Sequence, residues 1–333
     1  MKTAILKRSI ICLQNLSAIC VIILTVNLSS CSGSSSSNSL RIVFWNIQNG
    51  MWSGQDDNYD AFVKWVSEQQ PDICIWCEAQ SIFLSGTADR MPNKDRYLVD
   101  GWGELAARYG HQYCYTGGHR DSYPQVITSK YPIENIERIV GTEPDSVVTH
   151  GAGWARIKVN GHMLNLVSLH LWPQRFAYGA EDKDASIAGN GGDHYRRMEM
   201  EYICKHTIGT VSASADQMWF MAGDFNARSR HDNWFYKYPE NDTRLLVHDY
   251  IKQNTPYLDI IADKYPGEFK TTTHGKARID FVYCTVPLYD RIVLANVLLD
   301  EYTTPVRDSK GLSNFWHPSD HLPIMVEFDM GKK

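Results

Sequence analysis

The sequence has no excess of positive charge. Its 333 residues include 33 Lys and Arg against 38 Asp and Glu, which gives a formal net charge of −5. Loss of an N-terminal segment containing Lys2, Lys7 and Arg8 would lower this to about −8. Proteins that wrap nucleic acid non-specifically need a basic surface, so this class is disfavoured, although a local basic strip or a bound metal could offset the average.

Several catalytic motifs are also missing. The chain contains no HExxH or Cys/His zinc spacing, no GxSxG nucleophile elbow and no P-loop. Zinc-dependent, acyl-transfer and nucleotide-powered chemistry are therefore less favoured. No internal repeat or interdomain linker is evident. With 43% hydrophobic residues, the segment 40–331 is long enough to form one large domain.

An apolar run near the N-terminus is too short to cross a membrane comfortably. It extends from Leu16 to Leu28 after a basic start, a pattern typical of a signal peptide. It ends in Leu28-Ser29-Ser30-Cys31, which resembles a bacterial lipobox and so implies cleavage before Cys31 and lipidation of its thiol. We therefore expect a signal peptide at 1–30, a Ser-rich tether at 31–39 and a lipid anchor in the membrane of the bacterial cell envelope. An ordinary signal peptide with a stray Cys is the alternative.

The remaining cysteines do not suggest a disulfide framework, because their number is odd: Cys74, Cys77, Cys114, Cys204 and Cys284. Cys74 and Cys77 have the spacing of a redox pair but lie in the apolar run 73–77. Residues i and i+3 of a strand face opposite sides, so we expect two buried thiols rather than a redox pair.

The first part of the chain predicts a strand, a helix and a second strand. Residues 40–45 are β-branched and aromatic, as in a strand. A helix then follows, whose apolar residues recur at i, i+3, i+4 and i+7: Tyr59, Phe62, Val63 and Val66. It stops before Pro71, and a strand at 72–77 comes next. This order is typical of a layered α/β protein.

The rest of the chain continues the alternation of strands and helices. Asn160-Gly161 suits a tight type I′ turn and predicts a hairpin of strands 153–159 and 162–169. The apolar segment 218–222 predicts a buried strand. Residues 231–243 are predicted to form an aromatic, charged loop. Further strands are expected at 111–115, 125–129, 277–285 and 322–328, and helices at 103–109, 195–210 and 245–251.

Polar side chains follow most of these strands. After 218–222 the chain turns at Gly223 and presents Asp224 and Asn226, which point the same way because they are two residues apart on an extended segment. A capping Asp and a turn Asn are the alternative interpretation. Polar residues also occur at the ends of, or interrupt, other apolar runs: Asn46, Gln48, Glu78, His170, Asp280, Asp320 and His321.

This set contains four carboxylates, two imidazoles and several amides. Carboxylate and amide oxygens suit Mg²⁺, and also Mn²⁺ or Ca²⁺, which leave water positions open for a phosphate oxygen. Two histidines can serve as general acid and base near neutral pH. The residues therefore favour metal-dependent phosphoester hydrolysis.

Six short segments resemble, in order, the motifs of the endonuclease/exonuclease/phosphatase superfamily: Phe44-Trp45-Asn46, Trp76-Cys77-Glu78, Ser168-Leu169-His170, Gly223-Asp224-Phe225-Asn226, Arg278-Ile279-Asp280-Phe281 and Ser319-Asp320-His321-Leu322-Pro323. This superfamily has the fold of pancreatic-type deoxyribonuclease, exonuclease III, neutral sphingomyelinases and inositol polyphosphate 5-phosphatases. The resemblance covers nearly all of 40–328. It implies a four-layer α/β/β/α sandwich, in which two mixed β-sheets pack face to face with helices outside.

The resemblance also implies roles for these residues. Glu78, with Asn46 and Asp320, would hold a divalent metal ion, most simply Mg²⁺. His321, paired with Asp280, would act as general base or bind the phosphate, and Asp224 is the competing base. Asn226 would hold a phosphate oxygen.

His170 is implied to protonate or stabilise the leaving oxygen, as in the deoxyribonuclease and sphingomyelinase branches. Gln48 departs from branches that have Asp or Asn there, which puts a metal role for Gln48 in doubt. No acid that would orient His170 is apparent, and Gln125 lies near where one would be sought.

Three other residues are candidates for substrate binding. Arg228 could meet phosphate charge bidentately, and Trp172, with other loop aromatics, could stack on sugar rings or bases. His119 lies in a polar, Gly-rich loop. A solvated or packed loop residue is the alternative for each.

The sequence thus favours a monomeric phosphoesterase that hydrolyses an extracellular phosphodiester or phosphomonoester, such as a phosphorylated glycan, a phospholipid head group or a sugar phosphate. One alternative is a secreted DNase I-like endonuclease acting on nucleic acid, which the presence of His170 supports. The other is a non-catalytic surface binding protein on the same fold.

Overall fold

The computed structural model describes residues 38–51, 57–79, 98–119, 122–141, 148–307 and 316–331, all within the compact unit Ser37–Lys333. The expected signal peptide at 1–30, nearly all of the tether and the expected lipidation site Cys31 lie outside the described residues. Within the described ranges, no helix is both long enough and apolar enough to cross a membrane.

The strands form two six-stranded sheets and one small pair, β12 (Val306–Arg307) with β13 (Trp316–His317). The first sheet has the order β11 (Ile292–Val297), β14 (Ile324–Asp329), β1 (Ser39–Asn46), β2 (Ile73–Cys77), β4 (Gln125–Ser129), β3 (Tyr113–Gly117). The second has the order β5 (Ile133–Ile139), β6 (Ala152–Val159), β7 (His162–His170), β8 (Met218–Asp224), β10 (Asp280–Cys284), β9 (Leu258–Asp259). Both are mixed, because β1 is parallel to β2 and β7 is parallel to β8 whereas the other pairings are antiparallel.

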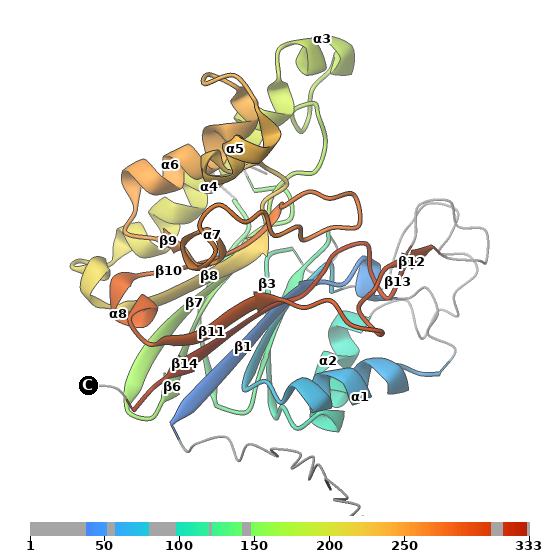
Figure 1. The fold of residues 1–333 in the computed structure, drawn as a ribbon, viewed down its shortest axis with the longest axis vertical. Coiled ribbons are helices and arrows are strands. Elements are labelled where there is room, and N and C mark those ends of the chain that lie inside the picture. Colours follow the sequence, from blue (N-terminus) through green and yellow to red (C-terminus); the bar gives the residue numbers. More distant parts are fainter. Residues whose placement is uncertain are drawn as a thin grey trace, which may run out of the picture. The chain divides into compact units, whose positions relative to one another are not determined.

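Helices lie on the outer faces of both sheets (Figure 1), and two short ones, at 260–264 and 286–289, contribute residues to the core between the sheets. Their bounds are α1 (Asp60–Gln69), α2 (Leu98–Arg108), α3 (Lys183–Ala188), α4 (Gly191–His206), α5 (Asn233–Tyr236), α6 (Leu246–Asn254), α7 (Ile260–Lys264) and α8 (Val286–Tyr289). Phe62 of α1 and Trp102 of α2 pack against Trp76 of the first sheet. Met200 of α4 and Ile251 of α6 pack on the second sheet.

Alternation along each strand divides its side chains between two cores. In β8, Phe220 and Ala222 enter the core between the sheets, whereas Trp219 and Met221 enter the core under α4 and α6. This period of two is what a strand buried on both faces requires. Three cores therefore separate four layers, and the expected α/β/β/α sandwich is confirmed.

The local predictions made from turns and cysteines are also confirmed. Asn160 and Gly161 have φ of 49° and 86°, as a type I′ turn requires, and they join β6 to β7. Cys74 lies in the core under α1 and α2, whereas Cys77 lies in the core between the sheets. Both thiols are free and buried.

Two of the longer strands, β5 and β11, were not predicted from the sequence, and nor were the two-residue strands β9, β12 and β13. The register of β5 shifts between Asn135 and Glu137 and that of β11 between Ile292 and Leu294, so neither strand has an unbroken alternation. The residues 231–243, expected to be a loop, contain the short helix α5, and the strand expected at 277–285 begins only at Asp280.

The fold leaves no room for a side chain at Gly223, just before Asp224. A Cβ built there would lie 2.3 Å from the carbonyl oxygen of Leu169 on β7. We expect Gly223→Ala to lower the free energy of unfolding by roughly 1–3 kcal/mol, the usual cost of overpacking, as measured by urea denaturation. The matched control is Gly103→Ala on the exposed face of α2, where a Cβ meets nothing within 4 Å. Gly103→Ala should raise the free energy of unfolding by about 0.8–1 kcal/mol, because Ala has a higher helix propensity than Gly. Equal stability of the two variants would contradict this reading of the packing.

Candidate active site

Three candidate residues lie side by side at the ends of neighbouring strands. His170, the last residue of β7, is in register with Asp224, the last residue of β8, and Asp224 is in register with Asp280, the first residue of β10. All three are buried. Neighbouring strands lie about 5 Å apart, so the register alone brings these side chains within reach of one ligand.

Two residues of the first sheet meet this row. Asn46 ends β1 in register with Cys77, and Glu78 follows Cys77. Asn46 Nδ2 donates to Glu78 Oε1 at 3.1 Å and to Asp224 Oδ2 at 3.0 Å. This amide therefore joins the two sheets at the edge where the candidate residues gather.

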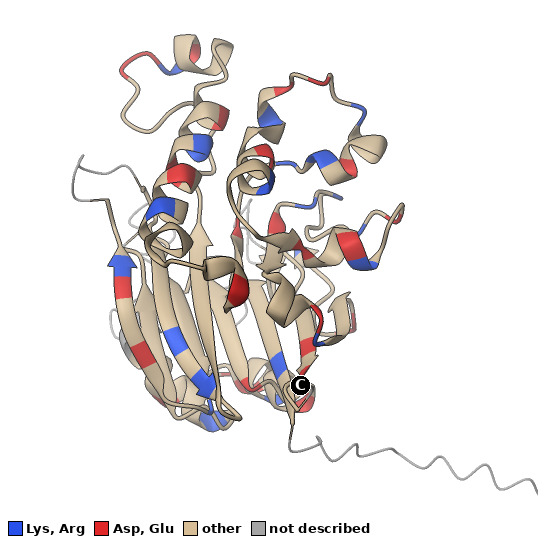
Figure 2. Ribbon diagram, turned by 90° about the vertical axis from the view of Figure 1, so that its left-hand side faces the viewer, with Lys and Arg blue, Asp and Glu red and all other residues tan. Residues whose placement is uncertain are grey.

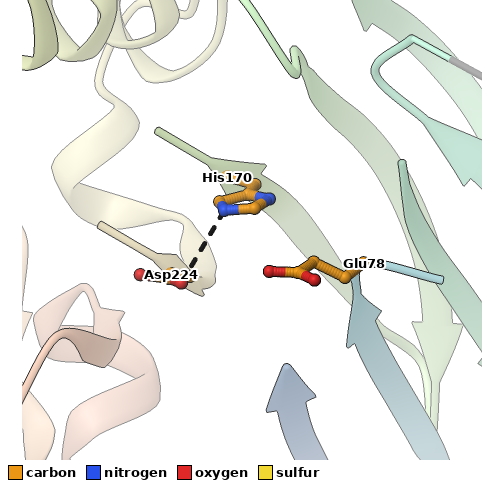
Figure 3. A group of neighbouring side chains, drawn as sticks. All are labelled: Glu78, His170 and Asp224. Atoms are coloured by element: carbon orange, nitrogen blue, oxygen red, sulfur yellow. Dashed lines mark ion pairs between the residues drawn. The ribbon is translucent and has the colours of Figure 1, made fainter. Parts of the chain in front are cut away.

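The carboxylate of Asp224 lies between two imidazoles. Its Oδ2 is 3.7 Å from His170 Nε2 and 3.9 Å from His321 Nε2. Figure 3 shows His170 and Glu78 directed toward it from the two sheets. Burial raises the pKa of Asp224 to about 8, and the charge of Asp280 adds to the shift. The site thus contains a carboxylate whose proton affinity suits a base near neutral pH.

His321 is held by Asp280. Its Nδ1 is 2.8 Å from Asp280 Oδ2, and its Nε2 is 3.8 Å from Asp320 Oδ1. Burial alone would lower the pKa of His321, but the charges of Asp280 and Asp320 and the hydrogen bond raise it well above its ordinary value. The ring is therefore positively charged at neutral pH and can pair with a phosphate oxygen.

Glu78 occupies a left-handed backbone conformation, with φ of 52°, where β2 ends. Its Oε2 accepts a hydrogen bond from the backbone nitrogen of Asn49 at 3.1 Å. Burial raises the pKa of Glu78, and the charge of Asp320 raises it further. Two carboxylates that oppose each other's ionisation leave negative charge that a cation would balance.

The donor set fits a divalent cation. Glu78, His170 and Asp224 each offer a ligand atom within 4.8 Å of the others, and so do Asp224, Asp280 and His321. Within the described part of the chain, Asp280 Oδ1 is buried without a hydrogen-bond partner. Four clustered carboxylates favour a cation that prefers oxygen ligands.

Asn46 directs its nitrogen, not its oxygen, at the carboxylates. Its Oδ1 accepts a hydrogen bond from the backbone nitrogen of Gln48 at 3.1 Å. To bind a metal ion, Asn46 would have to turn its amide over; as placed, it is a hydrogen-bond donor. The side chain of Gln48 accepts from the backbone nitrogen of Trp316 at 2.9 Å, so this residue holds the loop.

Asn226 and Arg228 lie next along the chain from Asp224. Asn226 Nδ2 donates to the carbonyl oxygen of Leu171 at 3.0 Å, which leaves its second N–H for a phosphate oxygen. The half-buried guanidinium of Arg228 lies over the ring of Tyr236, 5.6 Å from its centroid. Among the residues that the structure describes, none forms a hydrogen bond with the buried Nε of Arg228.

Trp172 and His119 differ in their relation to this cluster. Trp172 is half-buried, two residues after His170. His119 Nε2 contacts the carbonyl oxygens of Val140 at 3.0 Å and Val148 at 3.2 Å. In the described structure, His119 therefore supports a loop and makes no hydrogen bond or ion pair with the site residues.

The sequence analysis missed the rings beside His170. The ring of His150 stacks on His170 with centroids 4.5 Å apart, and the ring of Tyr123 meets His170 edge-on at 6.1 Å. His150 precedes the start of β6, whereas the candidate residues predicted from the sequence mostly follow the ends of strands. Because β6 and β7 are antiparallel, the start of one lies at the same edge as the end of the other. A pattern that included strand starts would have found His150.

The site thus gathers buried carboxylates and imidazoles from the ends of strands in both sheets. The chain belongs to the Endonuclease/Exonuclease/phosphatase family, which matches residues 43–321. Members of this family are hydrolytic phosphoesterases of the phosphodiesterase and nuclease type and typically depend on a divalent metal. No curated protein matches the sequence.

Solved structures share the fold. An AP endonuclease from Archaeoglobus fulgidus has 18% identity and a TM-score of 0.58, with 87% of this chain and 99% of that chain covered. A humanized D. rerio TDP2 has 15% identity and a TM-score of 0.52, with 88% of this chain and 99% of that chain covered. The human Nocturnin catalytic domain with bound sulfate has 13% identity and a TM-score of 0.52, covering 87% and 93%. At these identities the likeness shows the fold alone.

The two histidines that flank Asp224 should be needed for turnover. We expect His170→Ala and His321→Ala each to lower the rate of bis-(p-nitrophenyl) phosphate hydrolysis by roughly 10²–10⁴, the usual contribution of a general acid–base group. The control is His162→Ala, which removes a half-buried imidazole at the opposite end of β7 and should leave the rate unchanged. Full activity of either site variant would remove that histidine from the reaction.

Glu78 should be needed for metal affinity. We expect Glu78→Ala to raise the Mg²⁺ concentration for half-maximal rate by more than the roughly tenfold that loss of an outer-shell partner costs. A Mg²⁺ titration of the rate measures this, with Glu68→Ala on the exposed face of α1 as control. An unchanged Mg²⁺ requirement would exclude Glu78 as a ligand.

Proposed function

We propose that the protein is a Mg²⁺-dependent phosphoesterase that hydrolyses an extracellular phosphodiester or phosphomonoester by attack of water. The observation that carries this proposal is the position of Asp224 Oδ2, which lies within 4 Å of both imidazoles and accepts a hydrogen bond from Asn46. A base, a cationic ring and a neutral ring therefore surround one small space, as hydrolysis of a phosphate ester requires.

In this proposal the protonation state of each side chain determines its role. Asp224 in its ionised form accepts the proton of the attacking water; burial raises its pKa, and a cation bound beside it would favour the ionised form. Positively charged His321 pairs with a phosphate oxygen, while Asn226 holds another. His321 is not the base in this proposal, because its positive charge is paired with Asp280 and Asp320 and serves to bind the phosphate.

His170 faces the leaving oxygen in this proposal. Burial, together with the nearby His150 and His321, lowers the pKa of His170 well below its ordinary value. A neutral ring offers an N–H that stabilises the developing negative charge. A divalent cation held by Glu78 and Asp320 would neutralise phosphate charge and polarise the P–O bond.

The proposed substrate is an ester other than long nucleic acid: a phosphorylated glycan, a phospholipid head group or a sugar phosphate. The net charge of −5 supports this choice, as does the mixture of signs on the surface. Figure 2 shows Lys and Arg interspersed with Asp and Glu along the helices and outer strands. Anchoring through a lipid on Cys31 would place the enzyme on the cell envelope, where such esters occur.

A substrate screen tests the proposal. The purified protein is assayed with bis-(p-nitrophenyl) phosphate, p-nitrophenyl phosphate, sphingomyelin, sugar phosphates, RNA and plasmid DNA, with Mg²⁺ or with EDTA. We expect Mg²⁺-dependent release of product from a small or lipid ester, lost in Asp224→Asn. Nicking of plasmid DNA without hydrolysis of any small or lipid ester would instead support the nuclease. No hydrolysis of any substrate would support a binding protein.

A further inference from the structure

His170 lacks the carboxylate partner that His321 has. Asp280 hydrogen-bonds to His321 Nδ1 at 2.8 Å. His170 Nε2, by contrast, is 3.7 Å from Asp224, and within the described ranges its Nδ1 is buried without a hydrogen bond. Gln125, the residue near which an orienting acid was sought, donates from Nε2 to the carbonyl oxygen of Tyr123 at 3.3 Å and not to His170. The backbone of Tyr123, which raises the pKa of His170, approaches the ring without a hydrogen bond, so a further contact must help set the orientation of the ring.

Ring packing supplies that contact. His150 stacks on His170 with a centroid distance of 4.5 Å and an interplanar angle of 30°. The ring of Trp172 lies 6.0 Å from that of His150 at 35°. His150 and His170 are both buried, at 3% and 2% exposure. Rotation of the His170 ring out of its plane would break the stack, and the buried ring would gain no contact with water to compensate.

The His150 ring is itself fixed. Its Nδ1 is 3.1 Å from Ser122 Oγ, and the ring of Tyr123 packs edge-on against it at 4.8 Å. Gly118 and Gly151 allow the backbone to approach closely, since a Cβ on Gly151 would lie 2.5 Å from Gly118 Cα. Burial lowers the pKa of His150 to about 4, so the ring is neutral at neutral pH.

A buried carboxylate on α4 ties together the two segments that present these rings. Glu199 Oε1 accepts hydrogen bonds from Thr149 N at 2.9 Å and Thr149 Oγ1 at 2.7 Å. Glu199 Oε2 accepts from Trp172 N at 2.8 Å. Thr149 precedes His150, and Trp172 follows His170 by two residues. One fully buried side chain thus holds both sides of the stack.

We propose that His150 and Glu199 are positioning residues for His170: His150 sets the plane of the ring by stacking, and Glu199 fixes the two segments that bring the rings together. The part concerning catalysis rests on the proposed phosphoesterase function. A displacement of about 1 Å in a reacting group can cost about 10²-fold in rate, so loss of the stack should lower kcat. Within the described structure, neither residue forms a hydrogen bond or ion pair with Glu78, Asp320 or Asn226, so KM should change little.

Two substitutions at His150 separate the ring from its hydrogen bond. His150→Phe retains a ring that can stack but loses the bond to Ser122, whereas His150→Gln retains a polar group without a ring. We expect His150→Phe to keep kcat within about threefold and His150→Gln to lower it by about 10–10²-fold with KM within about threefold. The inference is overturned if His150→Gln is as active as His150→Phe.

Substitutions at two positions of α4 test the role of Glu199. Glu199→Gln should lower kcat by about tenfold or more, because an amide cannot accept all three hydrogen bonds with the strength of a carboxylate. Glu201→Gln, two residues along and paired at the surface with Arg197 and Lys205, should leave kcat unchanged. Thermal unfolding confirms that each variant is folded. Equal kcat values for the Glu199 and Glu201 variants would remove Glu199 from the positioning role.

A readout independent of activity separates this inference from the proposed function. Two-dimensional ¹H–¹³C NMR of the ring protons of His170, assigned by their absence in His170→Ala, reports the ring current of a stacked neighbour. We expect these resonances to move downfield in His150→Gln and to stay closer to wild type in His150→Phe. If the wild type hydrolyses no ester but the shifts follow this pattern, the proposed function fails and the positioning stands. If the wild type is active and the His170 resonances do not respond to His150→Gln, the positioning fails and the function stands.

Discussion

The register of β7, β8 and β10 is the constraint on which the site depends. It places His170, Asp224 and Asp280 in one row, because each is paired with the next across neighbouring strands. A slip of one residue would turn every side chain of a strand to the other face. The buried alternation of Phe220 and Ala222 with Trp219 and Met221 prevents such a slip. The packing of the two cores therefore sets the geometry of the chemical groups.

Burial then gives similar side chains different protonation states. The pKa of Asp224 is raised chiefly by burial, whereas the carboxylates beside His321 overcome burial and raise the pKa of that ring. His170 has no such partner, and burial lowers its pKa. The site thus contains a carboxylate that can act as base, a positively charged ring and a neutral ring. The two rings differ because His321, unlike His170, has a carboxylate at hydrogen-bond distance.

The central strands and their polar ends could be predicted from the sequence, because alternation and turn residues are local signals. The Asn160-Gly161 hairpin is an example. The turn expected at Gly223 is wrong, because β8 continues through Gly223 to Asp224. The strands β5 and β11 could not be found in this way, since a shift of register within each interrupts the alternation. Side-chain contacts between distant segments also leave no local pattern. The nitrogen of Asn46 facing Asp224, the stack of His150 on His170 and the bonds of Glu199 to Thr149 all depend on tertiary packing.

The most direct test of the central claim is a crystal structure of the protein grown with Mn²⁺ and inorganic phosphate, with the metal located by its anomalous scattering. We expect one or more Mn²⁺ ions bound to Glu78. We also expect a phosphate within hydrogen-bond distance of Asn226 and His321, with its phosphorus facing Asp224. Mn²⁺ and phosphate found on separate surfaces, with Glu78, Asp224 and His321 contacting neither, would contradict it.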